Sequence, residues 1–269
     1  AEEFDAVVVA AGACAARGVR AEGFEEGLAS GDVVYAVDYL TEQTRALLEG
    51  REPAISAEGK DVVVIGGGDT GNDCMGTAVR QGARTVRQLE YGPCAPEQRA
   101  ASNAWPEWPN VKKTDYGQEE AIALQGDDLR EWCADTQRVL LDSDGRVRGL
   151  QVHSLDWSAG KPSAVEGSER EIDAQLVLVA CGFAGPEHGV FDALGVPVAT
   201  AGRPLPVMEG GATGAAAATH RAELAEGAAA AGRAAVYVAG DARNGSSLVV
   251  SSMADALKCA AEVAVDLGL

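Results

Sequence analysis

Four apolar runs, uninterrupted by polar residues, recur along the chain, and each ends in small residues. They are AVVV in DAVVVAAGA from Asp5, VVVI from Val62, LVLV in AQLVLVACGF from Ala174, and AVYV in AAVYVAGDA from Ala234. Continuous rather than alternating apolar runs are typical of strands buried on both faces, as in parallel sheets covered by helices. The pattern therefore predicts an α/β protein.

The second run opens a predicted strand–helix–strand unit. It continues as VVVIGGGDTG over residues 62–71, and residues 71–82 then place apolar side chains at helical spacing before Gly82. Residues 85–89 have the composition of a short strand. Residues 61–90 together have the length of a βαβ unit.

Three further segments carry weaker signals. Residues 92–118 hold four prolines and two tryptophans, which predicts an irregular segment over a pocket or a domain face, with both tryptophans packed. Residues 137–156 alternate across a DSDGR turn, which predicts a hairpin capping one end of a domain. Alanine and glycine dominate residues 209–235, and composition leaves open a soft helix around 215–231 or a flexible insertion.

Charge and cysteine content narrow the function classes. The 269 residues carry 41 acids and 22 bases, a net charge of −19, which disfavours nucleic acid and anionic membrane as partners. The six cysteines show no metal-ligand spacing, so we expect reduced thiols and no metal site. The acidic start is unlike a secretory signal, and no apolar run reaches the roughly 18 residues of a membrane span. We expect a soluble protein that is part of a longer polypeptide.

The glycine-rich stretch after Ile65 is the main chemical signal. Gly66, Gly68 and Gly71 fit G-x-G-x-x-G, in which glycines permit a tight turn, close approach of a pyrophosphate and packing of helix on strand. Asp69 and Thr70 lie in the same stretch and are assigned to the same nucleotide site. Backbone N–H groups at a helix start attract phosphate without lysine. A structural turn without ligand is the alternative.

Glu90 ends the second strand of this unit, where a carboxylate accepts hydrogen bonds from a ribose diol. An acid there repels a 2′-phosphate, so NAD is favoured over NADP. A solvated acid at a strand end is the alternative, and the nearby Arg84 and Arg87 keep NADP open.

Runs spread over most of the chain match one known family. They are VVVIGGGDTGNDC (62–74), VRQGARTV (79–86), PEQR (96–99), WPEWP (105–109), TDYGQEEA (114–121), VEGSE (165–169), CGFAGPE (181–187), VAGDARNG (238–245) and SLVV (247–250). With these runs the chain resembles the small (β) subunit of glutamate synthase, most closely the C-terminal region of the plant- and algal-type NADH-dependent enzyme. NADPH-using relatives carry two arginines after the second strand, where this chain has Glu90-Tyr91-Gly92.

The resemblance implies an electron-transfer flavoprotein with two Rossmann-like, three-layer dinucleotide-binding domains, the NAD domain being inserted into the FAD domain. Residues 1–50 and 183–269 would belong to the FAD domain and residues 51–182 to the NAD(P) domain. Family members pass a hydride from NADH to FAD, and electrons continue through iron–sulfur clusters to the large (α) subunit, where glutamine and 2-oxoglutarate yield glutamate. The compartment implied is plastid stroma or cytoplasm.

The resemblance also assigns residues to FAD. Gly240 and Asp241 match the second FAD motif, Ser247 and Leu248 open the last helix toward the flavin, and Gly182 belongs to the run CGFAGPE. A plain strand–turn–helix with a capping serine is the alternative. The family's first FAD fingerprint and its cluster cysteines are expected upstream, so we expect this chain alone to bind FAD weakly or not at all. The cofactors carry the chemistry, and no catalytic residue is assigned.

Three functions remain open from the sequence. The first is an NADH-oxidising flavoprotein module of glutamate synthase, inactive as this chain alone. The second is a related NAD(P)H-flavin electron-transfer reductase, which the WPEWP and TDYGQEE runs argue against. The third is a non-catalytic nucleotide-binding fragment.

Overall fold

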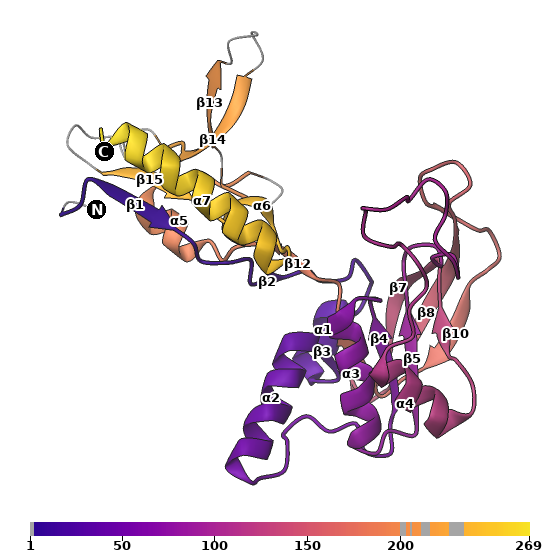
Figure 1. The fold of residues 1–269 in the computed structure, drawn as a ribbon. Coiled ribbons are helices and arrows are strands. Elements are labelled where there is room, and N and C mark those ends of the chain that lie inside the picture. Colours follow the sequence, from indigo (N-terminus) through magenta and orange to yellow (C-terminus); the bar gives the residue numbers. More distant parts are fainter. Residues whose placement is uncertain (1–2, 200–202, 205, 211–215, 226–233) are drawn as a thin grey trace. The chain divides into compact units, whose positions relative to one another are not determined.

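The computed structural model describes residues 3–199, 203–204, 206–210, 216–225 and 234–269, and it divides the chain into two compact units. The first unit comprises residues 1–17 and 182–269, and the second comprises residues 18–181 (Figure 1). Each unit has its own sheet and its own core.

A five-stranded parallel sheet forms the centre of the second unit. Its strands, in spatial order, are β3 (Val33–Tyr35), β11 (Leu176–Val179), β4 (Asp61–Ile65), β5 (Thr85–Leu89) and β6 (Arg130–Glu131). All neighbouring pairs run parallel. The predicted strand–helix–strand unit is confirmed, with helix α3 (Asp69–Arg80) between β4 and β5.

Both faces of this sheet are covered, which explains why its strands lack polar alternation. Val62 and Val64 of β4 pack toward helices α2 (Ala36–Glu49), α3 and α4 (Tyr116–Gln125), whereas Val63 packs on the opposite side. That side holds helix α1 (Phe24–Ser30) and an antiparallel sheet of β7 (Ala134–Leu141), β8 (Val147–Asp156) and β10 (Arg170–Asp173), with β9 (Ser163–Ala164) paired to β8. Figure 1 shows the three layers. The predicted hairpin of residues 137–156 therefore exists, and it covers a face of the sheet rather than one end.

The first predicted domain boundary, at residue 50, is wrong. Strand β3 pairs with β11 in the central sheet, and Tyr39 of the following helix is fully buried in the same core. The second unit therefore begins at residue 18, while its end at residue 181 lies beside the predicted boundary at 182.

The first unit contains a smaller mixed sheet with helices. Strand β1 (Ala6–Val9) runs parallel to β15 (Ala235–Val238), which pairs with β14 (Ala216–Ala222), and β14 pairs with β13 (Pro206–Gly210). The helices are α5 (Gly189–Leu194), α6 (Asp241–Asn244) and α7 (Val249–Asp266), and β2 (Ala15–Ala16) pairs with β12 (Phe183–Gly185). Val236 and Val238 face Phe191, while Tyr237 packs near Cys259.

A soft helix was one expectation for residues 215–231 of the alanine- and glycine-rich stretch. The described part of these residues does not form it. Residues 216–222 are strand β14, antiparallel to β13. Residues 211–215 and 226–233 of that stretch lie outside the described residues.

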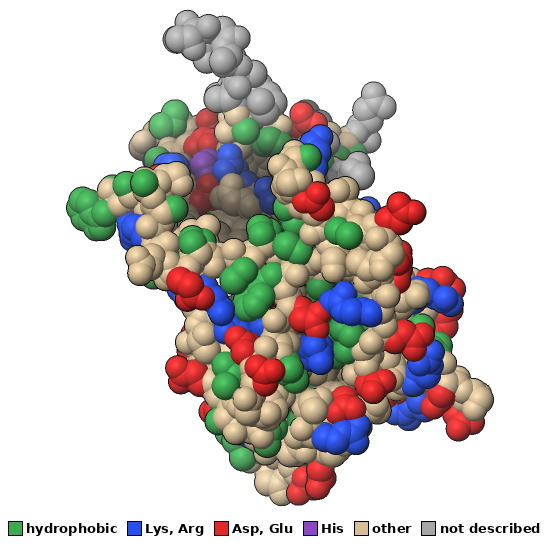
Figure 2. Space-filling model, turned by 90° about the vertical axis from the view of Figure 1, so that its right-hand side faces the viewer, with side chains coloured by type: hydrophobic (Ala, Val, Ile, Leu, Met, Phe, Trp, Pro, Cys, Tyr) green, Lys and Arg blue, Asp and Glu red, His purple; other side chains and the backbone are tan. Residues whose placement is uncertain are grey.

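The described residues show neither a large patch of one charge on the face drawn nor a long apolar helix. On the face drawn in Figure 2, acidic and basic side chains are interspersed rather than separated into one large patch of each sign. In the described part of the chain, we find no helix with the length and apolarity that a membrane crossing requires. Any attraction for an anion must therefore come from local groups.

Candidate dinucleotide-binding site

The glycine turn between β4 and α3 is built at the carboxyl edge of the parallel sheet. Gly66 has φ +121°, and a Cβ there would lie 2.3 Å from the carbonyl oxygen of Ala180. A Cβ at Gly71 would lie 2.4 Å from the carbonyl oxygen of Gly66. Both glycines therefore allow close backbone packing. Gly66 also adopts a backbone conformation that other residues avoid. Gly68 is the N-cap of α3 and has open space around it.

Buried amide side chains hold this turn in place. Gln88 of β5, fully buried, donates from Nε2 to the carbonyl oxygen of Gly66 at 2.8 Å. Gln118 of α4 donates to Oε1 of Gln88 at 3.1 Å, and the same side chain accepts from the backbone N–H of Asp115 at 2.8 Å. The start of α4 is thereby tied to the start of α3. These two amides could not be identified from the sequence, because nothing in their local pattern separates them from core-facing strand and helix positions.

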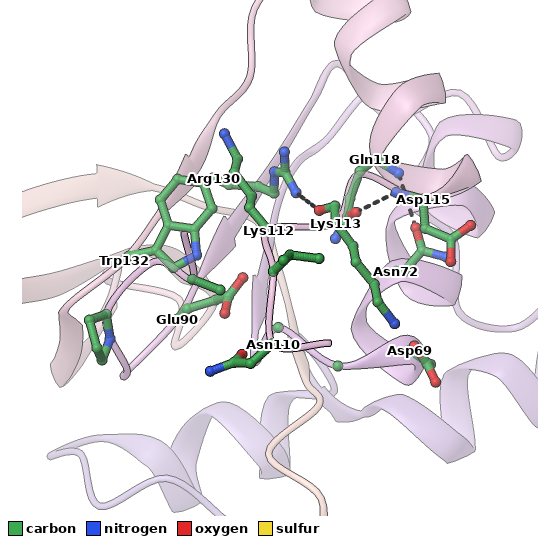
Figure 3. A pocket seen from close by; sticks show the side chains of 15 residues that line it. Asp69, Asn72, Glu90, Asn110, Lys112, Lys113, Asp115, Gln118, Arg130 and Trp132 are labelled. Carbon is green, nitrogen blue, oxygen red and sulfur yellow. Dashed lines mark hydrogen bonds between the residues drawn. The ribbon is translucent and has the colours of Figure 1, made fainter. Parts of the chain in front are cut away.

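A cavity of about 270 Å³ opens over the glycine turn (Figure 3). It is lined by Gly67, Gly68, Asp69, Asn72, Glu90, Pro93, Ala95, Asn110, Val111, Lys112, Lys113, Asp115, Gln118, Arg130 and Trp132. Gly68, Asp69 and Glu90, assigned from the sequence, thus lie together, and Gly66, Thr70 and Gly71 lie just behind them in the turn and the first helical turn. The segment predicted to lie over a pocket does line this cavity, through Pro93, Ala95 and residues 110–113.

Glu90 lies directly against the turn. A Cβ added at Gly67 would be 2.0 Å from the Glu90 carboxyl carbon, so the missing side chain makes the room that this carboxylate occupies. Burial raises the pKa of Glu90 above its ordinary value, and the Arg130 charge and a hydrogen bond from Trp132 partly oppose that rise. The acid is a half-buried wall of the cavity and not a solvated strand end.

The cavity also contains cations that sequence analysis missed. Arg130 is buried and donates to both carboxylate oxygens of Asp128, to the carbonyl oxygen of Lys113 at 2.7 Å and to Thr114 Oγ1 at 2.9 Å. Its guanidinium and the Lys112 ammonium lie 5.4 and 5.2 Å from the centre of the Trp132 ring. Lys112 and Lys113 thus line the cavity together with the helix start, from which alone the sequence predicted attraction for phosphate.

The two arginines that kept NADP open lie elsewhere. Arg84 is paired with Asp61 at the start of β4, and Arg87 with Glu131. Neither lines the cavity. The expectation that the two segment tryptophans are packed is also wrong, because Trp105 and Trp108 are 84% and 76% exposed.

In the first unit, the residues assigned to FAD gather at the end of β15. Asp241 Oδ1 accepts hydrogen bonds from Ser247 Oγ and Ser252 Oγ, each at 2.7 Å, and these bonds hold the pKa of Asp241 below its usual value. Leu248, 71% exposed, is the N-cap of α7, and Gly240 has φ +66°. Gly182 is instead next to β12, where its carbonyl oxygen accepts from the Arg17 amide at 2.9 Å.

A buried charge network lies behind this turn. His220 of β14 places Nδ1 2.8 Å from Glu262 Oε2 and Nε2 3.2 Å from Asp255 Oδ1. Asp255 also accepts from Arg243 at 3.0 Å and from the Gly240 amide at 2.8 Å. The place of His220 in this network could not be read from the sequence, since its partners on α7 are distant in the chain.

Burial raises the pKa of Asp255, but hydrogen bonds from Asn244, the Gly240 amide and His220, with the Arg243 charge, bring it below its usual range. The pKa of Glu262 is likewise lowered by the His220 contacts in spite of burial. Among the described residues, no cluster of three or more histidine, cysteine or carboxylate side chains fits a metal ion.

Comparison with known proteins supplies relatives across nearly the whole chain. NADH glutamate synthase of Schizosaccharomyces pombe is 36% identical over 271 residues, which cover 97% of this chain and 12% of that protein. The small chain of NADPH glutamate synthase from Bacillus subtilis is 36% identical over 270 residues, covering 97% of this chain and 50% of the relative. The corresponding small chain of Mycobacterium tuberculosis is 38% identical, with 97% and 49% covered.

Solved structures agree on the fold. FprA of Mycobacterium tuberculosis, solved in complex with NADPH, matches with a TM-score of 0.62 at 18% identity, covering 99% of this chain and 64% of that one. Thioredoxin reductase of T. acidophilum matches with a TM-score of 0.56 at 18% identity, covering 98% and 66%. The predicted fold class, α/β with two units of the dinucleotide-binding type, is confirmed.

No protein-family model matches the chain. The relatives nevertheless agree with one another and with the motif runs, and the chain spans about half the length of the small chains it matches. Over 97% of its length the chain therefore belongs to the family of the glutamate synthase small subunit.

Proposed function

We propose that the second unit binds NADH over the glycine turn and that the chain is the NADH-oxidising module of a glutamate synthase-type flavoprotein. One observation carries this proposal. Glu90 lies against the Gly67 backbone at the carboxyl edge of β4 and β5, beside the start of α3. A carboxylate in that place accepts hydrogen bonds from both hydroxyl groups of an adenosine ribose, while the backbone N–H groups at the helix start bind the diphosphate.

The residues present fit such a nucleotide. Gly68 lines the cavity, and a Cβ added there would have no protein atom within 4 Å, so the backbone at this glycine is open to a close ligand. A cavity of about 270 Å³ lies just below the usual range for ligand pockets, so it is assigned to one part of the dinucleotide, the adenosine diphosphate half. Trp132 and Lys112 provide an apolar and cationic wall on the Glu90 side.

The carboxylate of Glu90 supports NADH rather than NADPH. A 2′-phosphate placed beside a half-buried carboxylate meets direct repulsion. Arg130, the buried cation of the cavity, already uses four of its five N–H groups on Asp128, Lys113 and Thr114. A relative named for NADH is 36% identical to this chain and relatives named for NADPH are 36% and 38% identical, so the proposed preference for NADH rests on the residues of the cavity alone.

The first unit suits the flavin side of the same reaction. Asp241 is oriented by Ser247 and Ser252, and the exposed start of α7 presents N–H groups where negative charge is stabilised. NADH supplies the hydride in this family of reactions, and the protein contributes binding and orientation. We infer that FAD, held by Gly240, Asp241 and the start of α7, would supply the electron acceptor for NADH, and that a large subunit would be the partner for glutamate formation.

The ribose role of Glu90 predicts a large loss of affinity in Glu90→Ala. Two hydrogen bonds to a charged group are removed, and NADH binding is expected to weaken at least about tenfold while the fold is retained. Titration calorimetry with NADH measures the change, with Glu166→Ala, an exposed acid of the same unit, as the control.

The pH dependence of the same titration checks the charge. Because burial raises the pKa of Glu90, lowering the pH from neutral protonates this acid earlier than an exposed one and weakens NADH binding. Glu90→Gln is expected to remove that dependence. Equal NADH affinity in the wild-type and Glu90→Ala chains would refute the ribose role.

A further inference from the structure

One cation in the cavity is engaged differently from the others. Lys112 lies 3.5 Å from Glu97, and Arg130 is paired with Asp128. Among the described residues, Lys113 has no carboxylate within 4.0 Å, and its ammonium group lies over the Trp108 ring, 5.1 Å from the ring centre. Its ammonium group is therefore available to a ligand.

The side chain of Lys113 is directed across the cavity. Figure 3 shows it running from the 110–113 segment toward the start of α3, where Asp69 lies, whereas Lys112 points the other way, toward Trp132. The glycine turn presents its backbone N–H groups on one side of the cavity, and Lys113 extends toward them from the other side.

The backbone that carries Lys113 is fixed. Its carbonyl oxygen accepts from Arg130 at 2.7 Å, and Arg130 is held in turn by both oxygens of Asp128. The Lys112 amide donates to the Pro96 carbonyl oxygen at 2.9 Å. The ammonium group therefore extends from an anchored segment, although the side chain itself is exposed.

The negative charge around the helix start favours a cation on the other side of the cavity. Asp69 and Asp115 line the cavity on the side of α3 and α4, and the chain carries a net charge of −19. These acids repel a diphosphate, and the partial charge of one helix terminus is about half a unit. A lysine opposite the turn offsets that repulsion.

We propose that Lys113 binds the diphosphate of the dinucleotide from the side opposite the glycine turn. This role rests on the proposed binding of NADH in the same cavity. It makes the irregular proline- and tryptophan-containing segment a part of the binding site, with Arg130 as the residue that positions it.

Calorimetric titration of NADH and of ADP into wild-type, Lys113→Ala and Lys113→Arg chains tests the proposal. Loss of one charge-assisted contact is expected to weaken both ligands about tenfold in Lys113→Ala and much less in Lys113→Arg. The salt dependence of binding is expected to become shallower in Lys113→Ala only. Lys161→Ala, an exposed lysine of the same unit away from the cavity, is the control.

The outcomes separate this role from the proposed function. Affinity or salt dependence of Lys113→Ala equal to wild type, with NADH still bound, would overturn the lysine role alone. A wild-type chain that binds neither NADH nor ADP would overturn the proposed function and this role with it. A weakened Lys113→Ala that Lys113→Arg does not rescue would indicate a structural effect and also count against the proposal.

Discussion

Replacing Gly66 by alanine is expected to lower the free energy of unfolding of the second unit by about 3 kcal/mol and to abolish NADH binding. At φ +121° a non-glycine residue is strained, and the new Cβ would lie 2.3 Å from the carbonyl oxygen of Ala180. Ala180 follows β11, whose neighbours β3 and β4 hold it on both sides, so this backbone has little freedom to move away. The turn itself would have to shift.

Gly50→Ala is the matched control. Gly50 also has positive φ, +65°, but a Cβ there meets nothing within 4 Å. Its substitution is expected to cost about 1 kcal/mol, the strain of the left-handed conformation alone. All four tryptophans lie between residues 105 and 157, so denaturant unfolding followed by tryptophan fluorescence reports on the second unit. Equal losses for the two variants would show that close packing at the turn contributes nothing.

Replacing Asp255 by alanine is expected to destabilise the first unit. Asp255→Ala leaves His220 and Arg243 without their shared carboxylate and the Gly240 amide without an acceptor. Removing one partner from a buried network exposes the others to an uncompensated desolvation cost, here about 3 kcal/mol. The Gly240–Asp241 turn, which we assign to FAD, should loosen as a result.

Hydrogen exchange of peptides from residues 235–245 measures this loosening directly. Exchange is expected to be faster in Asp255→Ala, whereas Lys258→Ala, an exposed position on the same helix, should leave it unchanged. Unaltered exchange in Asp255→Ala would contradict the anchoring role of the network. The folded protein lowers the pKa values of both Asp255 and Glu262. Their contribution to the free energy of unfolding is therefore complete above their unfolded pKa values of about 4, and it is lost as the pH falls below these values.

Local sequence patterns were sufficient for the β4–α3–β5 unit. Its strands are continuous apolar runs, its helix is amphipathic, and the three glycines and Glu90 occupy places that the backbone geometry dictates. Each of these signals lies within one stretch of the chain. The structure accordingly places Gly68, Asp69 and Glu90 on one cavity, with Gly66 and Gly71 shaping its turn.

Elements and contacts that depend on residues distant in the chain could not be predicted from local sequence patterns. Strand β3 has three residues, too few for a pattern, and it belongs to the second unit because β11 pairs with it. Strand β14 is rich in alanine, a helix former, and pairing with β13 overrides that preference. Lys113 and Arg130 come together through a side chain–backbone hydrogen bond between segments that periodicity does not connect.

Calorimetric titration of the wild-type chain with NADH and with NADPH tests the central claim most directly, since the Glu90 carboxylate distinguishes these two ligands by their 2′ substituent. The cavity and its charges predict saturable one-to-one binding of NADH, tighter than NADPH by at least about tenfold. The absence of NADH binding, or NADPH binding as tight as that of NADH, would contradict the claim.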